Sequence, residues 1–338
     1  MKIAIVGLSG CGKSTCFRAI TQKTKRESEG LDPTKPHLGV VKVPDWRLEM
    51  LKSLFNPKKI TPAEITFEDL PGFHIPHIKE IEALMEVLGV FAGRDPVKDM
   101  DDIGVEFILA DTEVVKHRLS SLDKEMKQDR SPEKTREHET LLKCRECLER
   151  NMPIRSITLT HDEEKSIRGF QFLTGKPIVI VGNIGEDQTG SGVTGAIEAE
   201  CARRGFKSVE FCAELEAEIA DIDEPERGPF LKELGIEQLA RDRVIDIAYQ
   251  ALGYITFFTT KGDETKAWPV KNGVTALEAA GKIHSDIQRG FIRAEIVNFT
   301  DLEACGSVQE ARKKALVRLE GKEYVVRDGD IVDFRFNV

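Results

Sequence analysis

A phosphate-binding pattern occupies residues 7–14 (GLSGCGKS), where glycines frame a lysine that is followed by a hydroxyl side chain. The spacing matches G-x-x-x-x-G-K-[ST], and the segment follows an apolar run and precedes a predicted helix. Glycines let successive backbone N–H groups curl around a phosphate, while the helix N-terminus adds a partial positive charge. We expect the lysine to meet the β and γ phosphate oxygens and the serine to bind Mg²⁺. The predicted nucleotide contacts here are Ser9, Gly10, Cys11, Gly12, Lys13, Ser14 and Thr15.

Two further motifs follow predicted strands downstream of this loop. Asp69 opens a D-x-x-G sequence that ends at Gly72, where a switch GTPase places a magnesium-side carboxylate and a glycine that senses the γ-phosphate. Asn183 and Glu186 follow a buried apolar run, in the position of the base-reading N-K-x-D element. Because guanine is normally held by an aspartate at fixed reach, the longer Glu186 predicts a weakened preference for guanine.

The elements that must position these motifs alternate short apolar strands with amphipathic helices. This α/β rhythm covers residues 1–110 and returns over residues 170–252. Apolar runs at residues 3–6, 40–43 and 65–70 predict strands, and the run at 178–181 suits a buried parallel strand. The two stretches are therefore interpreted as one domain interrupted by an insertion.

The insertion, residues 111–169, is densely charged with apolar residues spaced three or four apart. This spacing predicts two helices paired as an antiparallel coiled coil, with a break near Ser131 and Pro132. The stripe consists of Val115, Leu119, Leu122 and Met126, then Leu141, Cys144 and Leu148. After residue 253 the pattern changes to a small α+β domain that extends to residue 338 and ends in a strand.

Composition limits the kinds of partner. The net charge of −9 over 338 residues excludes an overall basic field for nucleic acid or an anionic membrane. No charged-then-apolar leader or membrane-length apolar run is present, and seven scattered cysteines do not resemble a disulfide framework. We expect a cytoplasmic protein with no membrane association. A metal site at Cys144 and Cys147 is disfavoured because no second pair stands at zinc spacing.

The whole chain resembles the YchF type of Obg-related NTPases. The resemblance rests on residues 39–48 (GVVKVPDWRL), 183–186 (NIGE), 212–219 (CAELEAEI), 279–295 (AAGKIHSDIQRGFIRAE) and 319–338 (LEGKEYVVRDGDIVDFRFNV). It implies a P-loop NTPase G domain with an inserted coiled-coil hairpin, a C-terminal ubiquitin-like TGS domain, and association with ribosomes. The Asn-x-x-Glu form implies a preference for ATP over GTP. With the resemblance, the expected nucleotide contacts also include Gly72, Cys212, Ala213 and Glu214.

Several positions depart from the family pattern. The glycine-rich switch segment after Gly72 is short, since Phe73 runs directly into the next predicted elements. The family loop that carries a histidine thought to assist hydrolysis is reduced to residues 91–96 (FAGRDP). The magnesium-contacting threonine of the first switch falls at Pro33, so Thr34 is the alternative ligand beside Ser14 and Asp69. No catalytic residue is therefore assigned.

The sequence thus predicts a Mg²⁺-dependent protein that binds ATP, or GTP, hydrolyses it slowly and acts as a nucleotide-controlled switch in translation. Two alternatives remain: a nucleotide-sensing module that does not hydrolyse its ligand, and a guanine-specific member of the Obg superfamily. A small-molecule kinase is disfavoured by the TGS-like C-terminus. The hairpin and the TGS domain are candidate ribosome or RNA contacts, although their charge also fits a solvated surface.

Overall fold

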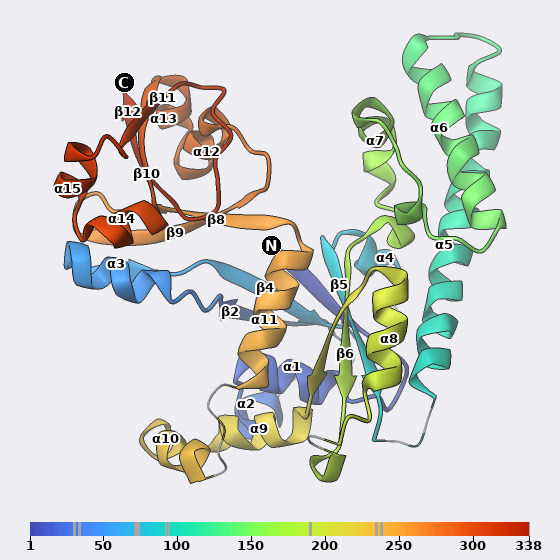
Figure 1. The fold of residues 1–338 in the computed structure, drawn as a ribbon. Helices are drawn as coiled ribbons and strands as arrows, with labels where there is room; N and C mark the ends of the chain where they lie inside the picture. Colours follow the sequence, from blue (N-terminus) through green and yellow to red (C-terminus); the bar gives the residue numbers. More distant parts are fainter. Residues whose placement is uncertain are drawn as a thin grey trace. The chain divides into compact units, whose positions relative to one another are not determined.

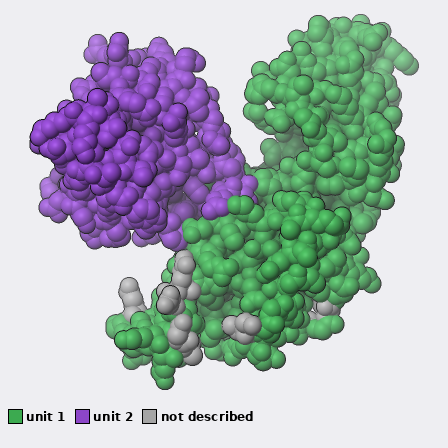
Figure 2. Space-filling model, in the orientation of Figure 1, with its two compact units in different colours: residues 1–39, 66–247 green, residues 40–65, 248–338 purple. Residues whose placement is uncertain are grey.

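The computed structural model describes residues 1–29, 32, 35–70, 75–91, 93, 95–188, 191–233, 236 and 239–337. The chain divides into two compact units, coloured separately in Figure 2. Unit 1 comprises residues 1–39 and 66–247, and unit 2 comprises residues 40–65 and 248–338. The sequence patterns did not predict that residues 40–65 group with the C-terminal strands. The domain boundaries proposed at residues 111, 170 and 253 remain predictions.

A six-stranded sheet organises unit 1, in the order β2-β4-β1-β5-β6-β7 (Figure 1). Strand β1 pairs in parallel with β4 and β5, and β6 pairs in parallel with β5 and β7. All residues of β5 and β6 are buried, as expected for apolar runs covered on both faces. The strands are β1 (Lys2–Val6), β2 (His37–Lys42), β4 (Glu64–Asp69), β5 (Ala83–Gly89), β6 (Ile178–Asn183) and β7 (Lys207–Phe211).

Helices flank this sheet. Apolar side chains of α5 and α8 pack on one face, where they share a core with Leu84 and Leu88 of β5. The helices of unit 1 are α1 (Lys13–Thr21), α2 (Lys25–Glu29), α4 (Ile75–Lys79), α5 (Pro96–Glu125), α6 (Pro132–Glu149), α7 (His161–Ile167), α8 (Gly195–Arg204), α9 (Ala213–Asp221), α10 (Glu224–Glu233) and α11 (Ala240–Ala251), whose last residues belong to unit 2. Four 3₁₀ turns are described: η1 (Ile154–Ser156), η2 (Arg168–Phe170), η3 (Leu173–Gly175) and η4 (Glu186–Gln188).

The predicted helical hairpin is formed by α5 and α6, which we call the arm (Figure 1). Helix α5 begins at Pro96 beside the sheet and continues without interruption into the arm. Helix α6 starts where the Ser-Pro pair predicted a turn, with the Ser131 hydroxyl accepting from Lys134 N–H at 3.3 Å. The Arg118 guanidinium joins the two helices by donating to both carboxylate oxygens of Glu137. The apolar stripe is buried at Val115, Leu119, Leu122, Leu141, Cys144 and Leu148.

Unit 2 contains a second six-stranded sheet, in the order β11-β10-β12-β8-β9-β3. Strands β8 and β9 form an antiparallel hairpin, β12 joins β8 in parallel, and α12 packs into the core beneath the sheet. This is the ubiquitin-like arrangement that the sequence predicted. The strands are β3 (Lys59–Thr61), β8 (Tyr254–Thr259), β9 (Glu264–Lys271), β10 (Phe291–Asn298), β11 (Arg318–Glu320) and β12 (Asp330–Phe336). The helices are α3 (Arg47–Phe55), α12 (Ala276–Ile283), α13 (Ser285–Arg289), α14 (Phe299–Cys305) and α15 (Val308–Lys313).

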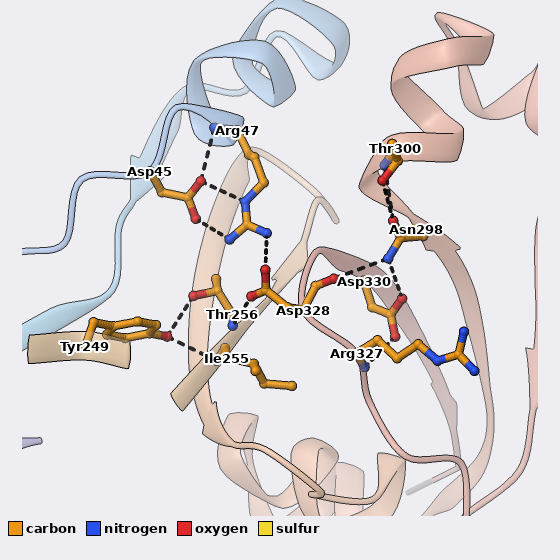
Figure 3. A network of polar contacts seen from close by, with 10 residues as sticks. All are labelled: Asp45, Arg47, Tyr249, Ile255, Thr256, Asn298, Thr300, Arg327, Asp328 and Asp330. Atoms are coloured by element: carbon orange, nitrogen blue, oxygen red, sulfur yellow. Dashed lines mark hydrogen bonds and ion pairs between the residues drawn. The ribbon is translucent and has the colours of Figure 1, made fainter. Parts of the chain in front are cut away.

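A polar network explains why residues 40–65 belong to unit 2 (Figure 3). The Arg47 guanidinium donates to Asp45 at 2.8 Å and to Asp328 at 2.7 Å, and it lies 5.0 Å from the centre of the Phe258 ring. Asp328 in turn accepts from the Thr256 N–H of β8 at 2.8 Å. Strand β3 also adds to the sheet edge by pairing in parallel with β9.

The predicted fold class, an α/β P-loop domain with a helical hairpin and a C-terminal ubiquitin-like domain, is confirmed. Within the described part of the chain, no helix combines the length and the apolar character needed to cross a membrane.

Candidate nucleotide-binding site

The loop between β1 and α1 has the shape of a phosphate cradle. Gly10 and Gly12 adopt positive φ values of 79° and 92°, a region that side chains rarely enter. A Cβ atom on Gly12 would lie only 2.2 Å from the Asn183 side-chain nitrogen, so a larger residue there would displace Asn183. The Lys13 ammonium folds back onto the loop and donates to the carbonyls of Gly7 at 2.9 Å and Leu8 at 3.0 Å. A phosphate could replace these two weak acceptors with charged ones.

Two of the three predicted magnesium-side residues, Ser14 at the start of α1 and Asp69 at the end of β4, lie close together. The Ser14 side chain, on the first turn of α1, lies close enough to the Asp69 carboxylate to stabilise its charged form. Burial raises the pKa of Asp69, while the Ser14 hydroxyl and the charges of His37 and Lys13 oppose that rise. A hydroxyl and a carboxylate are hard oxygen ligands, which suits Mg²⁺ bound beside phosphates.

Asn183 links the phosphate loop to the start of α9. It is 4% exposed at the end of β6, and its side-chain nitrogen donates to the Cys11 carbonyl at 3.0 Å. Its side-chain oxygen accepts from the Ala213 N–H at 3.1 Å. The segments around residues 11, 183 and 213, which are far apart in the sequence, therefore meet at one edge of the sheet. The Cys11 thiol itself is buried, so this residue faces the site through its backbone.

Glu186 lies exposed on the turn after Asn183. Burial raises the pKa of the Cys212 thiol, and the nearby negative charge of Glu186 adds to this rise. Gln188 closes the turn by accepting from the Gly185 N–H at 2.9 Å. Cys212 precedes α9 and is buried, whereas Glu214 is exposed on its first turn. The base-reading residues predicted from the sequence are thus gathered around one turn and one helix start.

Phe91 was not predicted to contact nucleotide, yet it stands at this edge. Its ring lies within 3.8 Å of the Cβ position of Gly12, and its own Cβ lies 3.6 Å from that of Gly185. The side chain is 45% exposed, which is unusual for a large aromatic residue. In the sequence it follows the buried strand β5 by two residues, and no motif marks it.

The remaining predicted residues contribute less to this geometry. Ser9 is exposed at the rim of the loop and Thr15 is half-buried on α1. Gly72 and Thr34 lie outside the described residues, so their predicted roles stay predictions.

The alternative metal site in the arm gains no support. Cys144 and Cys147 are both buried, and the Cys147 thiol donates to the Met152 carbonyl at 3.3 Å. Among the residues whose placement is described, no cluster of three or more histidine, cysteine or acidic side chains is arranged to hold a metal. The seven cysteines, all within the described ranges, form no disulfide.

The parallel sheet, the glycine cradle ahead of α1 and the Ser14–Asp69 pair define the fold of a P-loop NTPase. Residues 254–337 match the family model YchF-GTPase_C, described as "Protein of unknown function (DUF933)". The "Ribosome-binding ATPase YchF" of Bacillus subtilis (strain 168) is 39% identical over 361 residues, covering 99% of this chain and 98% of that protein. The protein of the same name from Escherichia coli O157:H7 is 34% identical, covering 100% and 99%.

This chain therefore belongs to the YchF family. A solved structure, described as "Structure of the Schizosaccharomyces pombe YchF GTPase", superposes with a TM-score of 0.85 at 26% identity, covering 99% of this chain and 97% of that one. The fold and the family predicted from the sequence are both confirmed.

Proposed function

We propose that this protein binds Mg²⁺–ATP at the carboxyl ends of strands β1, β4 and β6. It hydrolyses the ATP slowly and uses the nucleotide state as a switch at the ribosome. The observation that carries the proposal is the convergence of Lys13, the Ser14–Asp69 pair and Asn183 on one cradle. Three separate motifs are brought into contact there, which a glycine turn without a ligand would not need.

Each residue of the cradle has a distinct proposed role. The backbone N–H groups of residues 9–15 surround the phosphates, and Lys13 exchanges its two carbonyl acceptors for β and γ phosphate oxygens. Ser14 and Asp69 hold Mg²⁺, and the predicted contacts from Thr34 and Gly72 would complete the switch side. Bound Mg²⁺ supplies charge neutralisation between the β and γ phosphates. Asn183 keeps the loop in register with α9.

The base is proposed to lie between Phe91 and the start of α9. A purine stacked on the exposed Phe91 ring would present its edge to Asn183 and Glu186. Cys212, Ala213 and Glu214 border the same space from the α9 side. Because Glu186 reaches farther than the aspartate of guanine-specific sites, ATP is favoured over GTP.

Slow hydrolysis follows from the groups that the sequence lacks. Phe73 stands where many switch GTPases carry a water-orienting glutamine, and residues 91–96 contain no histidine. P-loop proteins without an added catalytic group turn over at about 10⁻⁴ to 10⁻³ per second, and a group supplied by a partner adds about 10³- to 10⁵-fold. We propose that the partner is the ribosome, as the names of the B. subtilis and E. coli relatives state for those proteins. The arm and the ubiquitin-like domain are the proposed contacts.

Calorimetric titration with Mg²⁺ and non-hydrolysable ATP or GTP tests the binding site. Wild type is expected to bind ATP more tightly than GTP, and Glu186→Asp should shift the ratio toward GTP. Glu218→Asp, an exposed position on α9, makes the same chemical change away from the base and should leave the ratio unchanged. Tighter binding of GTP by wild type would refute the base assignment.

Single-turnover release of phosphate from bound ATP, with and without ribosomes, tests hydrolysis. A slow release that ribosomes accelerate is expected. No release in either condition would favour the nucleotide-sensing module that does not hydrolyse its ligand.

A further inference from the structure

A short segment, residues 173–176, is buried except at Gly175 and forms hydrogen bonds both to the arm and to the connection between β4 and β5. We call this segment the clip; it contains η3 and ends one residue before Pro177, which leads into β6. Thr174 is 2% exposed and makes four hydrogen bonds, two to Asp111 of α5 and two to the adjacent residues Ile154 and Arg155. All three polar groups of this buried threonine are thus hydrogen-bonded, and its hydroxyl bonds to both parts of the chain.

On the arm side, the clip is bound to Asp111, in the middle of α5. The Asp111 carboxylate, fully buried on that helix, accepts from the Leu173 N–H at 3.0 Å, the Thr174 N–H at 2.8 Å and the Thr174 hydroxyl at 2.7 Å. Burial raises the pKa of Asp111, while these three donors oppose the rise. The carboxylate has no freedom to turn without breaking bonds to the clip.

The chain that returns from α6 is held by the same threonine. The Thr174 hydroxyl accepts from the Ile154 N–H at 3.1 Å, and the Thr174 carbonyl accepts from Arg155 at 3.0 Å. Both ends of the arm therefore meet at Thr174.

On the other side, the clip is bound to the end of α4. The Lys176 ammonium donates to the Lys79 carbonyl at 2.9 Å and to the Ile81 carbonyl. Lys176 is 6% exposed, and burial lowers its pKa, although the charges of Asp111 and Glu82 partly oppose this effect. Both carbonyls lie between β4 and β5, in the described residues 75–82, and the chain enters this connection after Asp69 of the nucleotide site.

We infer that the clip transmits the nucleotide state from the β4–β5 stretch to the arm, so that the arm root responds when ATP replaces ADP. The inference rests on the proposed function, because it regulates the same site. A shift of the Lys79 and Ile81 carbonyls must either break their bonds to Lys176 or carry the clip with them. Since Thr174 is bound to both ends of the arm, a displacement of the clip moves the arm root. Coupling is reciprocal, so a partner that binds the arm changes nucleotide affinity by the same factor.

Hydrogen exchange measured by mass spectrometry on the full chain tests this inference. Exchange is compared between Mg²⁺–ADP and a Mg²⁺-bound non-hydrolysable ATP analogue, at residues 75–82 and at the arm root, residues 105–115 and 150–157. Wild type should show a difference at both places, with rates at the arm root changing about fivefold, at the lower end of typical coupling.

Two variants and two controls separate coupling from folding. Lys176→Met removes the bonds to α4, and Thr174→Val removes the hydroxyl while keeping the shape. Both should keep the difference at residues 75–82 and lose it at the arm root. Thr174→Ser keeps the hydroxyl and should behave as wild type. Arg118→Met breaks the Glu137 bonds inside the arm, away from the clip, and should also retain the coupled response.

An arm-root difference of undiminished size in both Lys176→Met and Thr174→Val would overturn the inference. So would a wild-type arm root that stays unchanged while residues 75–82 respond to ATP. Calorimetry on the same samples distinguishes the second failure from a failure of the proposed function: if wild type binds no ATP, the proposed function falls and the inference falls with it.

Discussion

Replacing Glu86 with glutamine should remove a large pH dependence from the stability of unit 1. Glu86 lies in the middle of β5, is 2% exposed and points into the core shared with α5 and α8. Within the described ranges, no donor reaches its side-chain oxygen Oε1. Glutamine has the same shape and no charge, so it mimics the protonated acid.

The size of this pH dependence follows from the pKa of Glu86 in the folded protein. Burial raises the pKa of Glu86 from 4.5 to about 8. The positive charges of Arg155 and Arg204 oppose this rise, and the negative charges of Asp101 and Asp99 add to it. The folded state therefore keeps a proton that the unfolded chain releases above pH 4.5. Stability falls as the pH rises toward 8, by a total of about 5 kcal/mol at 1.36 kcal/mol per pH unit. About 3 to 4 kcal/mol of this loss falls between pH 5 and pH 8.

Urea unfolding followed by far-UV circular dichroism at pH 5 to 8.5 measures the effect. Both tryptophans, Trp46 and Trp268, lie in unit 2, so their fluorescence reports on that unit separately. Glu86→Gln should match wild type at pH 5 and exceed its free energy of unfolding by several kcal/mol at pH 8. Glu139→Gln, exposed on α6, controls for loss of a carboxylate and should leave the pH dependence unchanged. Equal pH slopes for wild type and Glu86→Gln would refute the reasoning.

Three further predictions concern the cradle and unit 2. Lys13→Ala should weaken ATP binding at least about 100-fold by calorimetry, because two charge-assisted bonds to phosphate are lost; tight binding by this variant would contradict the site. Gly12→Ala should abolish ATP binding in the same assay, since its Cβ would meet Asn183, whereas Gly10→Ala has open space and should cost only about 1 to 3 kcal/mol of backbone strain. Arg47→Met should destabilise unit 2 by about 1 to 3 kcal/mol, measured by tryptophan fluorescence in urea, because Asp45 and the more exposed Asp328 both lose their charged partner; an unchanged midpoint would exclude a stabilising role.

Much of the fold was visible in the sequence because local patterns encode it. The apolar runs at β5 and β6, the three- and four-residue spacing of the arm and the Ser131 cap each need only neighbouring residues to be read. The grouping of residues 40–65 with the C-terminal strands was not predictable in this way. It depends on the Arg47–Asp328 ion pair and on the pairing of β3 with β9, which join residues more than 200 positions apart.

The candidate site shows the same division. The glycines and Lys13 could be predicted because their chemistry is contained in eight consecutive residues. The two bonds of Asn183, to Cys11 and from Ala213, bring together segments from three strand ends and needed the sheet order. Phe91 carries no motif of its own, so only its position beside Gly12 draws attention to it.

Because α5 runs without interruption into the arm, a small change in its direction moves the far end of the arm by a larger distance. A helix rises about 1.5 Å per residue, so the 30 residues of α5 form a rod about 45 Å long. The part beyond Asp111 measures about 20 Å by the same rise, so a tilt of about 10° at that point displaces its far end by about 4 Å. A change too small to break the hydrogen bonds at the root would thus move the tip by more than the length of a hydrogen bond.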